Sequence, residues 1–243
     1  MNLSTLKKAA GASVIALGVA WGASEAHAVP EISLGLALDF SGSIDEDEFD
    51  LQKSAYANAI QSVIPTDGTV GISVTAFAEG ALLIRPFAEI DSEVAKQDLV
   101  DFFNDLDADN RGIDTGSTAI GEGIEVAAAS LQLSLGSVRT LIDVTTDGQN
   151  NLGVDPVTAA QDVVNAENIT AVNALGIGTG TAPGFNFGTD SFSLVVADFA
   201  ALEGALTEKL EREVNGIPEP ATIALLAVGL AGVGFAARRR LTA

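Results

Sequence analysis

The feature that most constrains the fold of this chain is an apolar run that ends abruptly in a carboxylate and two hydroxyls. Residues 32–38 are almost continuously apolar, which is typical of a parallel strand buried on both faces. Asp39, Ser41 and Ser43 follow at alternate positions, and Gly42 between the serines lets the backbone bend without steric cost. Ligands of open α/β sheets bind at the carboxyl ends of the strands, where the loops converge. The sequence therefore predicts a functional site at the end of this strand.

Asp39, Ser41 and Ser43 offer only hard oxygen atoms, which suit magnesium, manganese or calcium. The alternative interpretation of this short pattern is a turn followed by a helix cap. Two later segments favour the metal site. Residues 116–121, Gly-Ser-Thr-Ala-Ile-Gly, open a predicted helix, and residues 143–148, Asp-Val-Thr-Thr-Asp-Gly, end another apolar strand.

Together, these three segments resemble the von Willebrand factor A (vWA) domain and its metal-ion-dependent adhesion site (MIDAS), in a bacterial branch whose function is not established. The resemblance covers roughly residues 31–214. In that family, the first loop, a loop threonine and a later aspartate converge on one divalent cation. The resemblance implies Mg²⁺, with Mn²⁺ or Ca²⁺ as alternatives, and it implies an Asp or Glu of a partner protein at the cation. The implied metal ligands of this chain are Asp39, Ser41, Ser43, Thr118 and Asp147.

Residues 1–28 are predicted to be a secretory signal peptide. Lys7 and Lys8 precede an apolar run, and Ala26-His27-Ala28 forms a small-x-small cleavage site. The alternative, a membrane anchor, fits less well, because the run is shorter than the roughly 20 residues that a span needs.

Residues 217–243 combine three elements. Pro218-Glu219-Pro220 is followed by an uncharged stretch, residues 221–237, and then by the arginines 238–240. The simple interpretation is a transmembrane helix that anchors the carboxyl end, with the arginines on the cytoplasmic side. The combination also resembles the PEP-CTERM sorting signal of Gram-negative bacteria. That resemblance implies membrane insertion before processing by an exosortase, and delivery to the cell envelope, the cell surface or the extracellular matrix.

Composition excludes several functions for the remaining residues 29–216. The chain has no Cys, and its single His and single Trp lie within the predicted signal peptide. A zinc site with nitrogen and sulfur ligands is therefore excluded, as is catalysis by His or Cys. The formal net charge of −21 repels phosphate backbones, which excludes nucleic acid as a partner.

Residues 29–216 read as alternating strands and helices, which favours a doubly wound, mostly parallel sheet flanked by helices, as in vWA and Rossmann-like α/β folds. Residues 70–78 and 81–86 are predicted to form a hairpin that supplies one antiparallel strand. The other predicted strands are 32–38, 139–146, 169–177 and 192–196, and the predicted helices are 45–63, 92–106, 118–135, 156–168 and 198–214.

Two acidic features have two interpretations each. Asp143 is expected within a strand on the same face as Asp147, so it either supports a metal ligand or forms a structural ion pair. Residues 105–114 begin like a calcium-binding EF-hand loop, but Arg111 occupies the fifth position, which favours a solvated loop over a second calcium site. Arg111 is also the one basic residue close to the three motifs in sequence.

These observations predict an exported, surface- or matrix-associated binding module rather than an enzyme. It would capture an acidic group of a partner through the cation, for adhesion or matrix assembly. The partner is either a protein that presents Asp or Glu or an acidic matrix component. The alternatives are a metal-dependent hydrolase of the envelope, which includes a glycosidase with paired carboxylates, and a structural domain that keeps the metal for stability.

Overall fold

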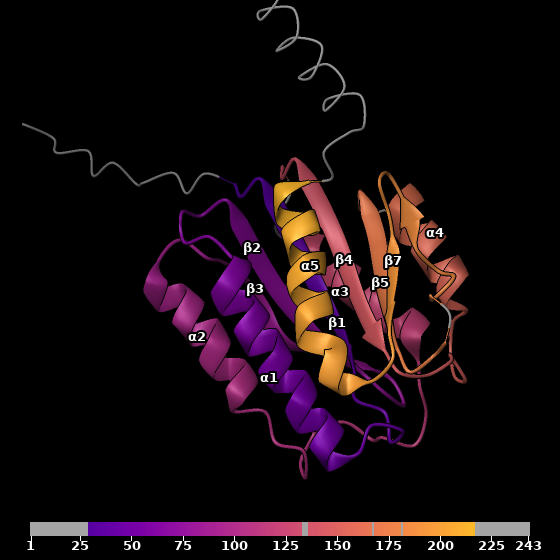
Figure 1. Cartoon of the computed structure of the whole chain (residues 1–243). Coiled ribbons are helices and arrows are strands. Elements are labelled where there is room, and N and C mark those ends of the chain that lie inside the picture. Colours follow the sequence, from indigo (N-terminus) through magenta and orange to yellow (C-terminus); the bar gives the residue numbers. More distant parts are fainter. Residues whose placement is uncertain (1–28, 133–135, 167, 181, 217–243) are drawn as a thin grey trace, which may run out of the picture.

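The computed structural model describes residues 29–132, 136–166, 168–180 and 182–216. These residues form one seven-stranded sheet with helices on both faces (Figure 1). The elements in chain order are β1 Ile32–Asp39, α1 Glu46–Val63, β2 Val70–Phe77, β3 Ala81–Glu89, α2 Glu93–Asn104, α3 Ile120–Leu131, β4 Arg139–Thr146, α4 Pro156–Ala166, β5 Ala171–Ile177, β6 Phe187–Gly188, β7 Ser193–Val196, a 3₁₀ turn Phe199–Ala201 and α5 Leu202–Asn215.

The strand order is β3-β2-β1-β4-β5-β6, and β7 also pairs with β5. β1 pairs in parallel with β2 and β4, and β4 pairs in parallel with β5. β3 runs antiparallel to β2, as the predicted hairpin requires. The predicted α/β fold with a mostly parallel sheet is therefore confirmed. The structure adds β6, a two-residue strand antiparallel to β5 that the sequence did not predict.

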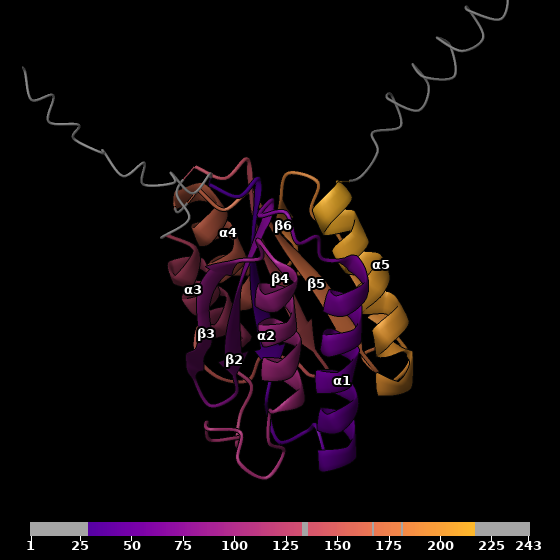
Figure 2. The ribbon, with the colours of Figure 1, turned by 90° about the vertical axis from the view of Figure 1, so that its left-hand side faces the viewer.

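The helices form two layers. Figure 2 shows α1 and α5 on one side of the sheet and α3 and α4 on the other. In β1, Leu34, Leu36 and Leu38 belong to the core under α1, α2 and α5, whereas Ala37 belongs to the core under α3 and α4. A Cβ on Gly35 would lie 3.2 Å from the side chain of Leu131 in α3. The small residues of β1 thus let α3 pack close to the sheet, which buries the strand on both faces.

The loop after β1 is short because a capping box fixes the start of α1. Asp45 accepts a hydrogen bond from the main-chain nitrogen of Glu48 (2.9 Å), and Glu48 accepts one from the main-chain nitrogen of Asp45 (3.0 Å). The predicted helix from Thr118 instead begins at Ile120, and residues 133–135 at its predicted end lie outside the described residues. Thr118 therefore belongs to the loop before α3.

The two ends of the described domain lie side by side. The main-chain nitrogen of Arg139 donates to the carbonyl of Glu31 (3.0 Å), and its guanidinium donates to the carbonyl of Glu213 near the end of α5 (2.7 Å). These contacts lie at the amino ends of β1 and β4, opposite the carboxyl ends that carry the predicted site.

In the ranges that the structure describes, no helix combines the length and the apolar character needed to cross a membrane. The predicted signal peptide, residues 1–28, and the predicted transmembrane helix, residues 221–237, both lie outside these ranges.

Candidate metal centre

Three loops meet at the carboxyl ends of β1 and β4. β1 ends at Asp39 and β4 ends at Thr146, and the parallel register places Leu38 beside Thr145. The residues that follow the two strands are therefore neighbours. The third loop, residues 105–119, connects α2 to α3. The main-chain nitrogen of Ala119, in this loop, donates to the carbonyl of Ala78 at the end of β2 (2.8 Å). The fold thus brings together the three segments that the sequence singled out.

Asp39 is fully buried, and both of its carboxylate oxygens accept hydrogen bonds. Oδ1 accepts from the main-chain nitrogen of Ser41 (2.8 Å), and Oδ2 accepts from the hydroxyl of Thr146 (2.6 Å). Burial raises the pKa of Asp39 from 3.8 to about 6, while the hydrogen bonds from Ser41 and Thr146 act in the opposite direction. These bonds fix the orientation of the carboxylate but do not compensate its desolvation.

The serine hydroxyls link Asp39 to Asp147. The Oγ atoms of Ser41 and Ser43 are 3.0 Å apart, and Ser43 donates to Oδ1 of Asp147 (2.8 Å). Burial also raises the pKa of Asp147, and the hydrogen bond from Ser43 opposes this change. Ser41 is buried, whereas Ser43 is exposed and Asp147 is half-buried, so the cluster runs from the interior to solvent.

Thr118 completes the group. A Cβ built on Gly148 would lie 3.8 Å from the hydroxyl oxygen of Thr118 and 4.0 Å from that of Ser43. The two hydroxyls therefore border the same small space beside Gly148, directly after Asp147. All five predicted ligands lie at one edge of the sheet.

This donor set fits a hard divalent cation. Neighbouring ligands of an octahedral Mg²⁺ with bonds of 2.0–2.1 Å lie about 2.9 Å apart, and the pairs Ser41–Ser43 and Ser43–Asp147 are 3.0 and 2.8 Å apart. A cation would also offset the unfavourable ionisation of two carboxylates whose pKa values burial raises. Within the described ranges, no three His, Cys, Asp or Glu side chains group as a metal site. A centre at this edge therefore depends on hydroxyl ligands.

Two asparagines that the sequence analysis did not select hold the loop of Thr118. The main-chain nitrogen of Thr118 donates to Oδ1 of Asn151, and that of Ile120 donates to Oδ1 of Asn150, both at 2.8 Å. The nitrogen of Asn151 in turn donates to the carbonyl of Thr118 (3.0 Å). The adjacent residue Ala119 provides no side-chain cap for α3. The signal for this role in the sequence is a pair of consecutive cap-type residues, one residue after the Asp-Gly turn.

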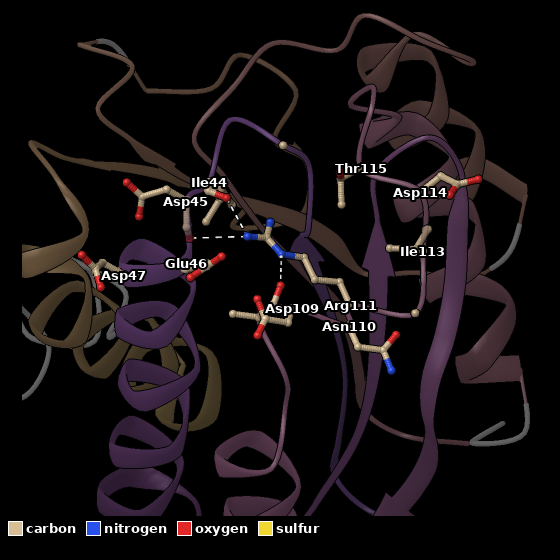
Figure 3. A pocket seen from close by; sticks show the side chains of 13 residues that line it. Ile44, Asp45, Glu46, Asp47, Asp109, Asn110, Arg111, Ile113, Asp114 and Thr115 are labelled. Atoms are coloured by element: carbon tan, nitrogen blue, oxygen red, sulfur yellow. Dashed lines mark hydrogen bonds between the residues drawn. The ribbon is translucent and has the colours of Figure 1, made fainter.

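Arg111, the basic residue near the three motifs in sequence, does not present a free guanidinium to solvent. Its nitrogen atoms donate to main-chain carbonyls of the loop after β1. Figure 3 shows the side chain reaching toward Ile44 and Asp45 across a cavity of about 980 Å³, with Asp47 and Asp109 among the residues that line it. The loop at 105–114 is thus partly bound to the site rather than wholly solvated.

Asp143 lies within β4 and its side chain meets α5. Its Oδ1 forms an ion pair with Nζ of Lys209 in α5, and both side chains are fully buried. Of the two interpretations of Asp143, the ion pair is confirmed. In the described part of the chain, neither carboxylate oxygen of Asp143 forms a hydrogen bond to a proposed metal ligand.

The arrangement of strands and helices matches solved vWA-type structures. Proximal thread matrix protein 1 from the mussel byssus is similar with a TM-score of 0.58 and 19% identity over 76% of this chain. The pilus adhesin SpaC from Lactobacillus rhamnosus GG is similar with a TM-score of 0.58 and 13% identity, and the match covers 76% of this chain and 30% of the adhesin. A von Willebrand factor type A structure from Catenulispora acidiphila has a TM-score of 0.56 and 17% identity, and the match covers 76% of this chain and 43% of that structure's chain.

The chain spans about half of the mussel protein, 48% of its length. At these identities the likeness concerns the fold alone, so the protein has a vWA-like fold. Another structure of the mussel protein has a zinc-occupied MIDAS motif.

The chain belongs to the DUF1194 family, described as proteins of unknown function, which matches residues 28–218. A PEP-CTERM protein-sorting motif matches residues 216–240. This motif indicates export and association with the cell surface or extracellular matrix, in agreement with the sequence analysis. Among curated proteins, none matches the chain.

Proposed function

We propose that this protein is an exported vWA module that binds an acidic group of a partner through a divalent cation. The ligands are Asp39, Ser41, Ser43, Thr118 and Asp147, and Mg²⁺ is the ion that we favour. The observation that carries this proposal is the convergence of all five side chains from three loops on one edge of the sheet. The sorting motif and the adhesin and matrix proteins among the structural neighbours support adhesion or matrix assembly as its setting.

The cation, when bound, would supply a Lewis-acidic position for an anionic oxygen. The chain's own residues divide the remaining tasks according to their burial. Asp39 and Ser41 are buried and hold the inner side of the site, whereas the exposed Ser43 and half-buried Asp147 leave its outer side open. A carboxylate on a partner's surface can therefore approach from solvent.

Charge favours a protein partner over an acidic polymer. The chain carries a net charge of −21, and acidic residues line the cavity beside the site, including Asp45, Glu46, Asp47 and Asp109. A polyanion would be repelled along this whole edge, whereas one Asp or Glu in a neutral or basic surface would meet the cation with little repulsion.

Binding rather than turnover also agrees with the surroundings of the site. Arg111, the basic residue near the motifs, uses its guanidinium donors on main-chain carbonyls and does not present them to a phosphate group. Metal-dependent hydrolysis that is lost in Asp39→Ala would contradict this part of the proposal.

The direct test is calorimetric titration of the chelator-treated chain with Mg²⁺, Mn²⁺ and Ca²⁺. We expect one site in the wild type and none in Asp39→Ala. Asp101→Ala, which removes an exposed carboxylate in α2, is the matched control and should bind as the wild type does. A wild-type chain that binds none of the three ions would refute the metal centre.

The partner class is tested on the same variants. Immobilised peptides with one Asp or Glu should retain the wild-type chain in the presence of Mg²⁺ and release it on addition of chelator. The corresponding Asn and Gln peptides and an acidic polysaccharide should not retain it. If chelator lowers stability but no carboxylate ligand is bound, the metal serves structure alone and the binding function is refuted.

A further inference from the structure

Arg111 joins two of the three loops of the proposed metal centre. Its side chain starts in the loop that carries Thr118 and crosses to the loop after β1 (Figure 3). The guanidinium donates to main-chain carbonyls only: Nη1 to Phe40 (3.3 Å) and Ser41 (3.0 Å), Nη2 to Ile44 (2.7 Å) and Asp45 (3.4 Å), and Nε to Ala108 (3.3 Å).

The geometry of these contacts requires arginine. The planar guanidinium presents its donors in a fixed fork, which an ammonium group cannot reproduce. The plane also lies over the ring of Phe49 in α1, with its carbon atom 4.6 Å from the ring centroid, so the side chain is held on a second side. Lysine at this position would keep the positive charge but would lose the fork and most of the stacking.

The carbonyls that Arg111 binds flank the proposed ligands. Ser41 is itself one of the acceptors, and the acceptor at Ile44 follows Ser43 directly. A second link joins the same two loops, because the nitrogen of Gly42 donates to the carbonyl of Thr115 (2.8 Å). A Cβ on Gly42 would lie 3.0 Å from that oxygen, so glycine permits this close approach. The serine hydroxyls are thus fixed relative to the loop that brings Thr118.

We propose that Arg111 is a positioning residue that sets the affinity and the ion preference of the metal centre by holding the main chain of residues 40–45 in one arrangement. This inference rests on the function proposed above. Mg²⁺ demands near-ideal octahedral geometry at 2.0–2.1 Å, whereas Ca²⁺ accepts longer and more variable bonds. A rigid loop therefore favours Mg²⁺, and a loosened loop loses Mg²⁺ affinity before Ca²⁺ affinity.

The charge of Arg111 acts in the opposite direction. The guanidinium lies near the carboxylates of Asp39 and Asp147, so as a positive charge it competes with a cation. Removing the charge alone would strengthen metal binding, whereas removing the hydrogen-bonding fork would weaken it. The sign of the change in affinity therefore separates the two effects, and Arg111→Lys isolates the loss of the fork, because the charge is retained.

The experiment compares Arg111→Lys and Arg111→Gln with the wild type in the full chain, by calorimetric titration with Mg²⁺ and with Ca²⁺. Arg85→Lys is the matched control, because Arg85 also lies over a phenylalanine ring, that of Phe102, but belongs to β3. We expect both Arg111 variants to bind Mg²⁺ about 10–100-fold more weakly, with a smaller loss for Ca²⁺, and Arg85→Lys to bind as the wild type does.

Amide hydrogen exchange of the metal-free proteins gives a readout that does not depend on metal binding. The amide of Gly42 should exchange faster in Arg111→Lys than in the wild type, while amides in the core strand β1 should stay equally protected, which shows that the variant remains folded. If Arg111→Gln fails to fold, Arg111→Lys alone carries the test.

Wild-type Mg²⁺ affinity in Arg111→Lys would overturn the inference and leave the proposed function intact. Tighter binding in Arg111→Gln would also overturn it, since Arg111 would then act as a competing charge. A wild-type chain that binds no divalent ion would overturn the proposed function and this inference together.

Discussion

Substitution of Lys209 by Met tests how the buried charges between α5 and the sheet are balanced. Nζ of Lys209 pairs with Asp143 and lies 3.1 Å from Oε1 of Glu213, and all three side chains are fully buried. Asn173 donates a further hydrogen bond to the same oxygen of Glu213 (2.8 Å). Methionine would fill a similar volume but would leave two buried carboxylates without their cation. Breaking a buried pair in this way costs about 3–5 kcal/mol of the free energy of unfolding.

The loss should depend on pH with a defined sign. Burial, and after it the charge of Asp143, raises the pKa of Glu213 from 4.5 to about 7, while Lys209 lowers it. The native state therefore holds a proton that the unfolded chain releases, and stability falls as pH rises from about 4.5 to about 7. Without Lys209 the pKa of Glu213 rises further, so the decline extends above pH 7. The deficit of the variant is thus larger at pH 8 than at pH 5.

Urea unfolding followed by far-ultraviolet circular dichroism at both pH values measures this deficit. At pH 8 it corresponds to a lowering of Tm by about 6–20 °C for a domain of this size. Lys53→Met is the matched control, since Lys53 forms a partly exposed pair with Asp50 and its loss should cost about 1 kcal/mol or less. A deficit below 1 kcal/mol at pH 8 in Lys209→Met, or one that grows toward pH 5, would refute the reasoning.

Three further outcomes are expected. Mg²⁺ at about 100 times its dissociation constant should stabilise the wild type by about 2.7 kcal/mol and leave the stability of Asp39→Ala unchanged in a thermal melt. An equal shift in both proteins would contradict the assignment of Asp39 as a metal ligand. Asn151→Ala, which removes the acceptor for the amide of Thr118, should weaken Mg²⁺ binding about 10-fold or more in calorimetry, and unchanged affinity would show that the loop needs no such support. Gly121→Ala should destabilise the domain by about 1–3 kcal/mol in urea unfolding, because the new Cβ would collide with a main-chain carbonyl. Gly204→Ala has open space around the new Cβ and should stabilise the domain by about 0.5–1 kcal/mol. The opposite order of stabilities would refute the packing argument.

The architecture was accessible from the sequence because its signals are local. The almost continuous apolar run of residues 32–38 predicted a buried parallel strand, and β1 covers this run and ends one residue later, at Asp39. Parallel strands have their carboxyl ends at one edge, which agrees with the grouping of Asp39 with Asp147 that the resemblance to the vWA domain implied. The two-residue strand β6 gave no such signal, since no periodicity can be read from two residues.

The partners of individual charged residues were not accessible in the same way. Asp143 pairs with Lys209 because α5 packs across α1 and the strands, and nothing near Asp143 in sequence indicates that contact. Arg111 was recognised only as a basic residue near the motifs. Its acceptors are carbonyl groups, which every residue carries, so the sequence holds no pattern that identifies them.

The positions of the chain ends have a consequence for how an attached copy is oriented. Glu31 and Glu213 are joined through Arg139 at the amino ends of the strands, and the sorting motif begins at residue 216, just beyond α5. β1 runs from this end of the domain to the proposed metal centre. It has eight residues, so its length is about 26 Å at 3.3 Å per residue. The point of attachment and the proposed metal centre therefore lie at opposite ends of the strands, so attachment through the motif would leave the metal edge free to meet a partner.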